Sequence, residues 1–358
     1  MIRGARRLVA AASALVALAG LVWTAPQAPA STSPTVGCGA AAQSVITTDY
    51  ETSARDIYAG ELASPEVSAD LRHVTSSTAL ASALASGSQA LVHAATHKIV
   101  YTPLWHIVRL RVLSSSGQVL ADVGGPYILA PVRGQIRYHG TVVGSFVMSV
   151  QDDSGYEKLV TRFTAVPIEI YRSGAPLMGI GFPRAEVPAS VPADGTPITV
   201  GGVQSVSVSY SVLAFPTGTD GVLLAIPAAT AASAAASCAE VNAETYGEIS
   251  VHLAALLDLR SAAKFYVSFD HEFTTDSLTF VRSGARQLAS SDGLAGPASI
   301  PDRGSVTYDG QSWLAYSFRA KHHVQVCLLF PDTAPSTGTT GATGTSGPSG
   351  PSGATASS

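Results

Sequence analysis

The chain has 358 residues, of which 46% are apolar and 13% charged, and its formal net charge is −4. A chain of this length has room for about two domains. The negative balance excludes the basic patch by which a protein binds nucleic acid. Low charge together with many alanine, glycine, serine, threonine and valine residues is typical of a secreted, β-rich protein and not of a disordered one.

The N-terminal residues indicate export. Arginines at positions 3, 6 and 7 precede an apolar run that ends near Trp23, and the small-residue triplet Ala28-Pro29-Ala30 follows. This is the pattern of a cleaved signal peptide. We therefore predict a signal peptide over residues 1–30 and a secreted protein, extracellular or associated with the cell wall. The alternative is an uncleaved anchor, but the run is shorter than the ~20 residues of a membrane span and prolines follow it.

The clearest strand pattern surrounds the turn Ser-Ser-Ser-Gly at 114–117, where apolar and polar residues alternate on both sides. Alternation with a period of two indicates a half-buried hairpin, because successive side chains of a strand point to opposite faces. If residues 115 and 116 form a two-residue loop, Val108 lies opposite Val123 and the apolar residues share one face.

The same register places Arg109 directly opposite Asp122 on the polar face, with Arg111 two residues away from Arg109. One interpretation is a cross-strand ion pair, worth roughly 0.2–1 kcal/mol. The other is a ligand site, in which the two guanidinium groups bind a carboxylate or phosphate and Asp122 orients Arg109 or binds a ligand amine. The sequence leaves both interpretations open.

A second hairpin is predicted over 135–150, around the turn His139-Gly140. A helix is predicted over Ser154–Phe163, because its apolar residues recur at the spacing of one helix face. Asp152 or Asp153 is its predicted N-cap, since a carboxylate there accepts the free N–H groups of the first turn. Catalysis by the paired carboxylates is the alternative, although adjacent residues rarely converge on one substrate.

The order of hairpin, GxxVG strand and short helix resembles an extracellular Cache-type sensor domain, the PAS-like module of bacterial receptors. The residues that carry the likeness are RLRVLSSSGQVLADVGG, GTVVGSFVMSVQDD and GYEKLVTRF, and the likeness extends over roughly residues 40–172. It implies N-terminal helices and a small-metabolite pocket on the inner face of the sheet. Carried over by position, the resemblance implies these pocket residues: Arg109, Arg111, Asp122, Tyr127, Met148 and Gln151.

The rest of the chain predicts helices and a repeated β unit. Residues 38–98 have helical spacing, whereas 173–197 are rich in proline and glycine and indicate a linker. The segments 191–227 and 300–331 share an order of proline, glycine and alternating strands, which predicts two related β-meanders of about three strands each.

A helical block is predicted between the two meanders, from Cys238 to about Ala263, followed by a short strand over Phe265–Phe269. The predicted fold class is therefore α+β: an antiparallel PAS/Cache-like sheet with N-terminal helices, then two related β-meander units with an intervening helical block. Two arrangements fit this order. One is a duplicated unit with the sensor-like stretch inserted in its first copy, and the other is a single bundle of both helical blocks.

Three cysteines follow the predicted cleavage site: Cys38, Cys238 and Cys327. A disulfide is expected in an oxidising compartment. We predict the pair Cys38–Cys238, because both cysteines open helical segments and Cys327 lies in an apolar strand, although sequence alone does not fix connectivity. CxxC and HExxH motifs are absent from the sequence, and His322-His323 would point to opposite faces of a strand, so we predict no metal site and no cofactor.

The tail from Thr333 has glycine at every third position from 338 to 353, too few triplets for a collagen triple helix, and a disordered tail is predicted. The predicted divisions are a signal peptide (1–30), a Cache-like sensor module (31–172), a first β-meander with its linker (173–227), a helical block with the second β-meander (238–332) and the tail (333–358).

Together these features predict a secreted, sensor-like protein that binds a small carboxylate or amino-acid-like metabolite. The protein would lack a signalling module of its own and would act with a membrane or envelope partner. The alternative is a structural or protein-interaction component of the bacterial cell envelope, which predicts that Arg109 and Arg111 are exposed or paired, with no cavity. No enzymatic activity is predicted, because the sequence contains no GxSxG, Cys-His or metal-ligand spacing.

Overall fold

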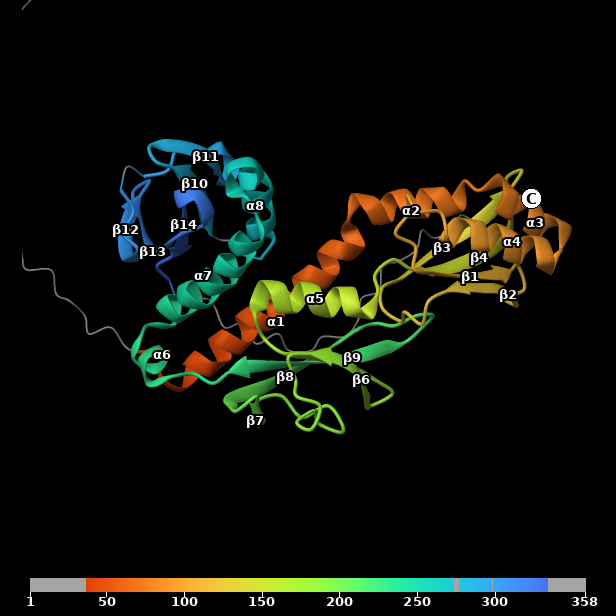
Figure 1. Cartoon of the computed structure of the whole chain (residues 1–358). Coiled ribbons are helices and arrows are strands. Elements are labelled where there is room, and N and C mark those ends of the chain that lie inside the picture. The colour runs from red at the N-terminus through yellow and green to blue at the C-terminus, as the bar shows by residue number, and fades with distance from the viewer. Residues whose placement is uncertain (1–36, 274–276, 298, 334–358) are drawn as a thin grey trace, which may run out of the picture. The chain divides into compact units, whose positions relative to one another are not determined.

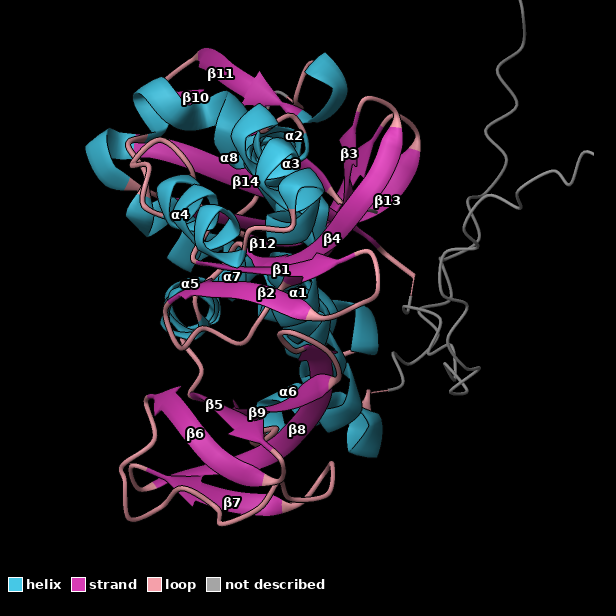
Figure 2. Ribbon diagram, turned by 90° about the vertical axis from the view of Figure 1, so that its right-hand side faces the viewer, coloured by secondary structure: helices cyan, strands magenta, loops and turns pink. Residues whose placement is uncertain are grey.

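The computed structural model describes residues 37–273, 277–297 and 299–333; the predicted signal peptide and residues 334–358 of the predicted tail lie outside these ranges. The described residues form an α+β fold of helices and three antiparallel sheets (Figures 1 and 2). In this part of the chain no helix has both the length and the apolar character needed to cross a membrane. The α-helices are α1 (Ala42–Ala63), α2 (Pro65–Thr75), α3 (Thr78–Ser86), α4 (Gln89–Val100), α5 (Asp153–Thr164), α6 (Ala231–Ala235), α7 (Cys238–Leu256) and α8 (Leu259–Phe273).

The first sheet contains both predicted hairpins and has the strand order β2-β1-β4-β3. Helices α3 and α4 pack against it, and its buried face includes Leu110, Val112, Phe146 and Met148. This burial follows from the alternation of apolar residues along the strands. The strands are β1 (Arg109–Ser114), β2 (Val119–Gly124), β3 (Pro131–Tyr138) and β4 (Thr141–Ser149).

The register of the first hairpin differs by two residues from the prediction: Leu110, and not Val108, lies opposite Val123. The loop has three residues, since the N–H of Ser114 donates to the carbonyl of Gln118, and a bulge after Val112 adds one more residue. Because the shift is even, the same apolar residues still face the core.

The second and third sheets each have five strands, in the orders β6-β5-β9-β8-β7 and β11-β10-β14-β13-β12. Counted along the chain, both orders are 2-1-5-4-3, and both first hairpins carry a bulge, after Ile170 and after Val281. The strands are β5 (Ile168–Arg172), β6 (Ala175–Ile180), β7 (Pro197–Val200), β8 (Val203–Leu213), β9 (Thr219–Pro227), β10 (Leu278–Ser283), β11 (Arg286–Ser290), β12 (Arg303–Tyr308), β13 (Gln311–Arg319) and β14 (Val324–Pro331).

Two boundaries therefore differ from the sequence analysis. Strand β5, which we placed at the end of the sensor-like module, pairs with β6 and β9 of the second sheet. Strand β6 lies inside the segment 173–197, which we predicted as a linker. The partner strand β9 begins at Thr219, so no local pattern around β5 identifies the sheet to which it belongs.

The predicted strand over Phe265–Phe269 is wrong, because these residues lie within α8. The two phenylalanines are four residues apart on one side of the helix, and their ring centroids are 5.6 Å apart. A short aromatic run fits the periodicity of a strand as well as that of a helix, and only the longer pattern of the whole segment distinguishes the two. His322-His323 likewise lies in a 3-10 turn, Lys321–His323 (η3), and not in a strand.

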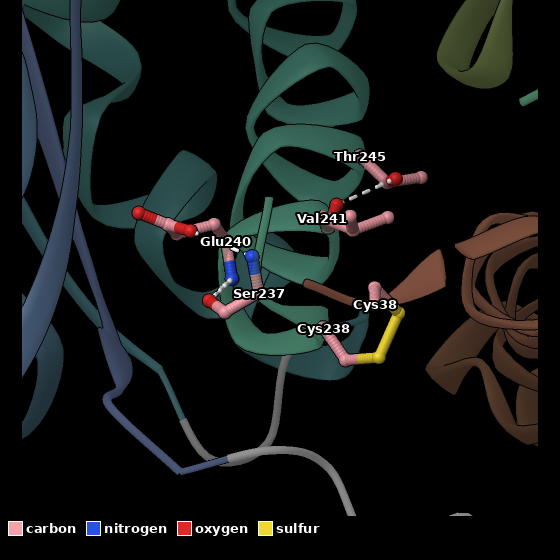
Figure 3. The surroundings of a disulfide bond; sticks show 6 residues. All are labelled: Cys38, Ser237, Cys238, Glu240, Val241 and Thr245. Atoms are coloured by element: carbon pink, nitrogen blue, oxygen red, sulfur yellow. Dashed lines mark hydrogen bonds between the residues drawn. A yellow bond between two sulfur atoms is a disulfide. The ribbon is translucent and has the colours of Figure 1, made fainter. Parts of the chain in front are cut away.

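A disulfide joins Cys38, just before the short 3-10 helix Gly39–Ala41 (η1), to Cys238, the first residue of α7 (Figure 3). This is the pairing that the sequence favoured. Its position at the start of α7 is fixed by a capping box, in which Ser237 and Glu240 bond each other's backbone N–H. Cys327 is a free, buried thiol in β14.

Candidate functional site

Three of the predicted pocket residues meet on the polar face of the first hairpin; we call Arg109, Arg111 and Asp122 the arginine cluster. Asp122 accepts hydrogen bonds from Arg109 at 2.9 and 3.0 Å and from Arg111 at 3.0 and 2.7 Å. Burial raises the pKa of Asp122, but the hydrogen bonds and charges of the two arginines outweigh burial and hold that pKa below its usual value.

The arginine cluster lies against the second sheet. The guanidinium carbons of Arg109 and Arg111 are 4.7 and 5.5 Å from the ring centroid of Phe215, in the loop between β8 and β9. The backbone N–H of Phe215 donates to the carbonyl of Ile128, and Ala214 forms a bridge with Leu129. The cluster thus links the first sheet to the loop between β8 and β9 of the second sheet.

Among the described residues, no hydrogen bond or ring contact joins the other three predicted pocket residues to the arginine cluster. Met148 is fully buried in the core and Gln151 is 6% exposed, whereas Tyr127 is half-buried with its ring against Gly125. None of the six residues lines either of the two cavities described below. Their role in ligand binding stays a prediction.

Removing the charge of Asp122 is expected to destabilise the fold. Asp122→Asn leaves two adjacent guanidinium groups without a counterion, and we expect the free energy of unfolding to fall by about 1–2 kcal/mol. Urea denaturation measures the change. The exposed pair of Glu51 and Arg55 on α1 supplies the control, since Glu51→Gln should have a much smaller effect. Equal effects of the two variants would contradict the linking role of the cluster.

A cavity of about 930 Å³, the α7 groove, lies between α7, α6, the first half of α1 and strands β12 and β13. Two structural features place these walls together. Asn242 of α7 donates to Asp49 of α1 at 3.1 Å, and Gly247 lets the Tyr316 ring approach α7 closely, because a Cβ at position 247 would overlap that ring. The groove residues that carry charge or aromatic rings are Tyr50, Glu240, Glu244, Glu248, Arg303 and Tyr316.

Arg303 is held from three sides at one end of the groove. Its Nε and Nη2 donate to the Glu244 carboxylate at 2.9 and 3.4 Å, and its Nη1 donates to the carbonyls of Asp302 and Ser317 at 2.7 and 3.0 Å. The guanidinium carbon is 3.4 Å from the ring centroid of Tyr316. These contacts fix the plane of the guanidinium group, which orients it toward one approach direction.

Glu248 lies one helical turn after Glu244 in the same groove. Within the described residues, its carboxylate makes no hydrogen bond or ion pair. Burial and then the charge of Glu244 raise the pKa of Glu248, while His252 and Arg303 lower it. Burial and then the charge of Glu248 raise the pKa of the Tyr50 hydroxyl, so the two groups interact electrostatically in the groove.

The sequence analysis did not predict the α7 groove. Its charged residues come from α7 and β12 and its aromatic rings from α1 and β13, so no local motif unites them. One signal was present: glutamates at positions 240, 244 and 248 recur every four residues and mark one acidic face of a helix. That spacing alone is typical of a solvated face, so it would not have indicated a groove.

No family model and no curated protein matches the chain. The solved structures it is similar to include the periplasmic domain of Vibrio cholerae LuxQ, with 12% identity and a TM-score of 0.31 over 52% of this chain and 98% of that domain. They also include the ligand-binding domain of the Pseudomonas fluorescens chemoreceptor CtaA in complex with L-serine, with 12% identity and a TM-score of 0.29 over 49% and 93%.

A third similar structure is the ligand-binding domain of Mlp24 with asparagine, with 8% identity and a TM-score of 0.15 over 80% of this chain and 95% of that domain. These neighbours are periplasmic or ligand-binding domains. At these TM-scores the similarities assign neither a site nor a ligand to this chain.

Proposed function

We propose that the chain is a secreted, sensor-like binding protein whose α7 groove takes an amino-acid-like metabolite. The observation that supports this most is the carboxylate of Glu248, which lies in a groove with aromatic walls and, among the described residues, has no hydrogen-bonding or ion-pair partner. Glu248 is exposed at this groove, and the primary amine of a ligand would form a charge-assisted hydrogen bond with its carboxylate.

Arg303 offers a second recognition element. A guanidinium group has five N–H donors, and four of those of Arg303 are used by Glu244, Asp302 and Ser317. The fifth, on Nη2, would serve a ligand carboxylate in competition with the Tyr316 hydroxyl, with which Arg303 also forms a hydrogen bond. A ligand whose amine binds Glu248 and whose carboxylate binds Arg303 has the two charges of an amino acid. We therefore propose a zwitterionic ligand in place of a simple carboxylate.

The groove has the size and lining of a metabolite site. Its volume of about 930 Å³ falls within the roughly 300–1,000 Å³ of small-molecule pockets. Val241 and Leu314 add apolar surface to the rings of Tyr50 and Tyr316. Apolar walls with a few fixed charges favour a ligand with an apolar side chain, because the walls supply affinity and the charges supply orientation.

Calorimetric titration of the purified chain with L-amino acids, butylamine and butyrate tests the proposal. We expect an apolar amino acid to bind more tightly than butylamine, because only the amino acid also uses Arg303. Glu248→Gln should weaken amino-acid binding about tenfold, since it removes the charge but keeps the shape.

Glu66→Gln is the matched control, because Glu66 is an exposed carboxylate on α2, outside the groove. The control should bind amino acids like the unchanged protein. Absence of amino-acid binding, or equal weakening by both variants, would refute the proposal.

A second candidate is the structural or protein-interaction role in the cell envelope. It is favoured by the arginine cluster, whose two arginines are paired with Asp122 and line neither cavity. Under this proposal the chain recovers specific envelope proteins from intact cells, and Glu248→Gln leaves that recovery unchanged. Under the metabolite proposal, calorimetry shows weaker amino-acid binding by Glu248→Gln than by Glu66→Gln.

A further inference from the structure

A second cavity, of about 560 Å³, lies between α8 and β11 in the third sheet; we call it the α8 cavity. It shares no residue with the α7 groove. Its helical wall carries Lys264, Ser268 and His271, which are spaced at i, i+4 and i+7 and therefore lie on one face of α8. A lysine and a histidine thus face the same hollow.

Lys264 has no counterion among the residues that the structure describes, and His271 has an electrostatic interaction with its sequence neighbour Asp270. Neither Lys264 nor His271 forms a salt bridge there, and none of the described lining residues is acidic. Asp270, the neighbour of His271 in sequence, is buried and accepts hydrogen bonds from Ser250 and Thr279. A hollow whose described lining residues include basic groups and no acidic one favours an anionic ligand.

The opposite wall is held in place and supplies a hydroxyl. Gln287 donates to Ser290 Oγ at 2.9 Å and to the carbonyl of Leu294 at 2.7 Å, and it accepts from the N–H of Gly296 at 3.0 Å. The Ser291 hydroxyl accepts from the N–H of Thr279 at 2.8 Å, which leaves its own hydrogen to donate. These hydrogen bonds hold the Gln287 and Ser291 side chains in place on this wall.

We infer that the α8 cavity binds the oxyanion head of a small organic acid, with Lys264 as the cationic group and the His271 imidazole and the hydroxyls of Ser268 and Ser291 as hydrogen-bond donors. Val267, Leu288 and Ala289 line the remainder and face the apolar part of the ligand. Carboxylates and phosphates share this oxyanion chemistry, and lysine binds both as a point charge.

Ligand-observed NMR titration of the purified chain with acetate, butyrate and inorganic phosphate, at constant ionic strength, tests the inference and separates the two head groups. If the apolar wall contributes, butyrate should bind about tenfold more tightly than acetate, because two further methylenes are buried. Binding of phosphate more tightly than acetate would assign the head group as a phosphate, and the reverse would assign it as a carboxylate.

Lys264→Gln should weaken the better-bound anion at least fivefold. Lys98→Gln, which removes an exposed lysine near the end of α4, should leave that affinity unchanged. Glu248→Gln should also leave it unchanged, so that failure of the α7 groove and failure of this cavity give different results. Equal weakening by Lys264→Gln and Lys98→Gln, or no binding of any of the three anions, would overturn the inference.

Discussion

Replacing Cys38 and Cys238 together with serine should lower the free energy of unfolding by about 5 kcal/mol. The disulfide closes a loop with a sequence separation of 200, and a cross-link over a loop of that length removes much conformational freedom from the unfolded chain. A loss of this size is a large part of the roughly 5–15 kcal/mol that stabilises a typical protein. Guanidinium denaturation of the oxidised protein and the double variant measures it.

Cys327→Ser is the control for the disulfide. Cys327 is buried and lies near the Ser317 hydroxyl in the third sheet, so its replacement changes packing but no cross-link. Reduction of the unchanged protein should reproduce the loss seen in the double variant and should have no further effect on that variant. A double variant as stable as the oxidised protein would show that the disulfide contributes little to stability.

The protein should be less stable at about pH 8 than at about pH 5, by about 3 kcal/mol from Glu157 alone. Glu157 of α5 is 1% exposed, and its Oε1 accepts no hydrogen bond from the described residues. Burial, followed by the charges of Glu169 and Asp153, raises the pKa of Glu157 to about 8. The folded state therefore keeps this carboxyl protonated at pH values where the unfolded chain ionises it.

The direction of the effect follows from the raised pKa. Below about pH 4.5 the carboxyl of Glu157 is protonated in both states, and its contribution to stability is fully present. As the pH rises toward 8, ionisation of this carboxyl lowers the free energy of the unfolded state but not that of the folded state. The free energy of unfolding therefore falls. Burial also raises the pKa of Glu169 and of Asp220, which strengthens the same trend.

Glu157→Gln isolates the contribution of this carboxyl to the pH dependence of stability, because glutamine has nearly the same shape and cannot ionise. We expect the variant to lose less stability between about pH 5 and pH 8, with the largest difference from the unchanged protein at the higher pH. Thermal unfolding across this range is the measurement. Glu51→Gln, on the exposed surface of α1, should keep the original pH dependence. A slope unaltered by Glu157→Gln would refute a neutral, buried Glu157.

Local chemistry made part of this structure predictable. The helix α5 and its cap at Asp152 follow from a carboxylate placed before an apolar face, and the hairpins follow from alternation around turn residues. The disulfide followed from two cysteines at the starts of helical segments. The helix and the hairpins could be inferred because their residues lie within one turn or one hairpin, where steric and hydrogen-bonding preferences act directly.

The features that could not be predicted depend on residues far apart in the chain. The register of the first hairpin depended on a bulge at Val112, which the apolar pattern does not encode because an even shift keeps the same face buried. The α7 groove needs Tyr50, Glu248 and Arg303 to meet, and only the packing of three separate elements brings them together. Phe215, against which the arginine cluster lies, gave no signal of that contact in the sequence.

The position of the disulfide also determines how the chain carries mechanical force. The loop that it closes contains the first and second sheets entirely, since strands β1 to β9 all lie between Cys38 and Cys238. Tension applied at residues 37 and 333 passes through the two sulfur atoms directly to α7. The first two sheets are thus shielded from the load, while α7, α8 and the third sheet lie in its path and would yield first.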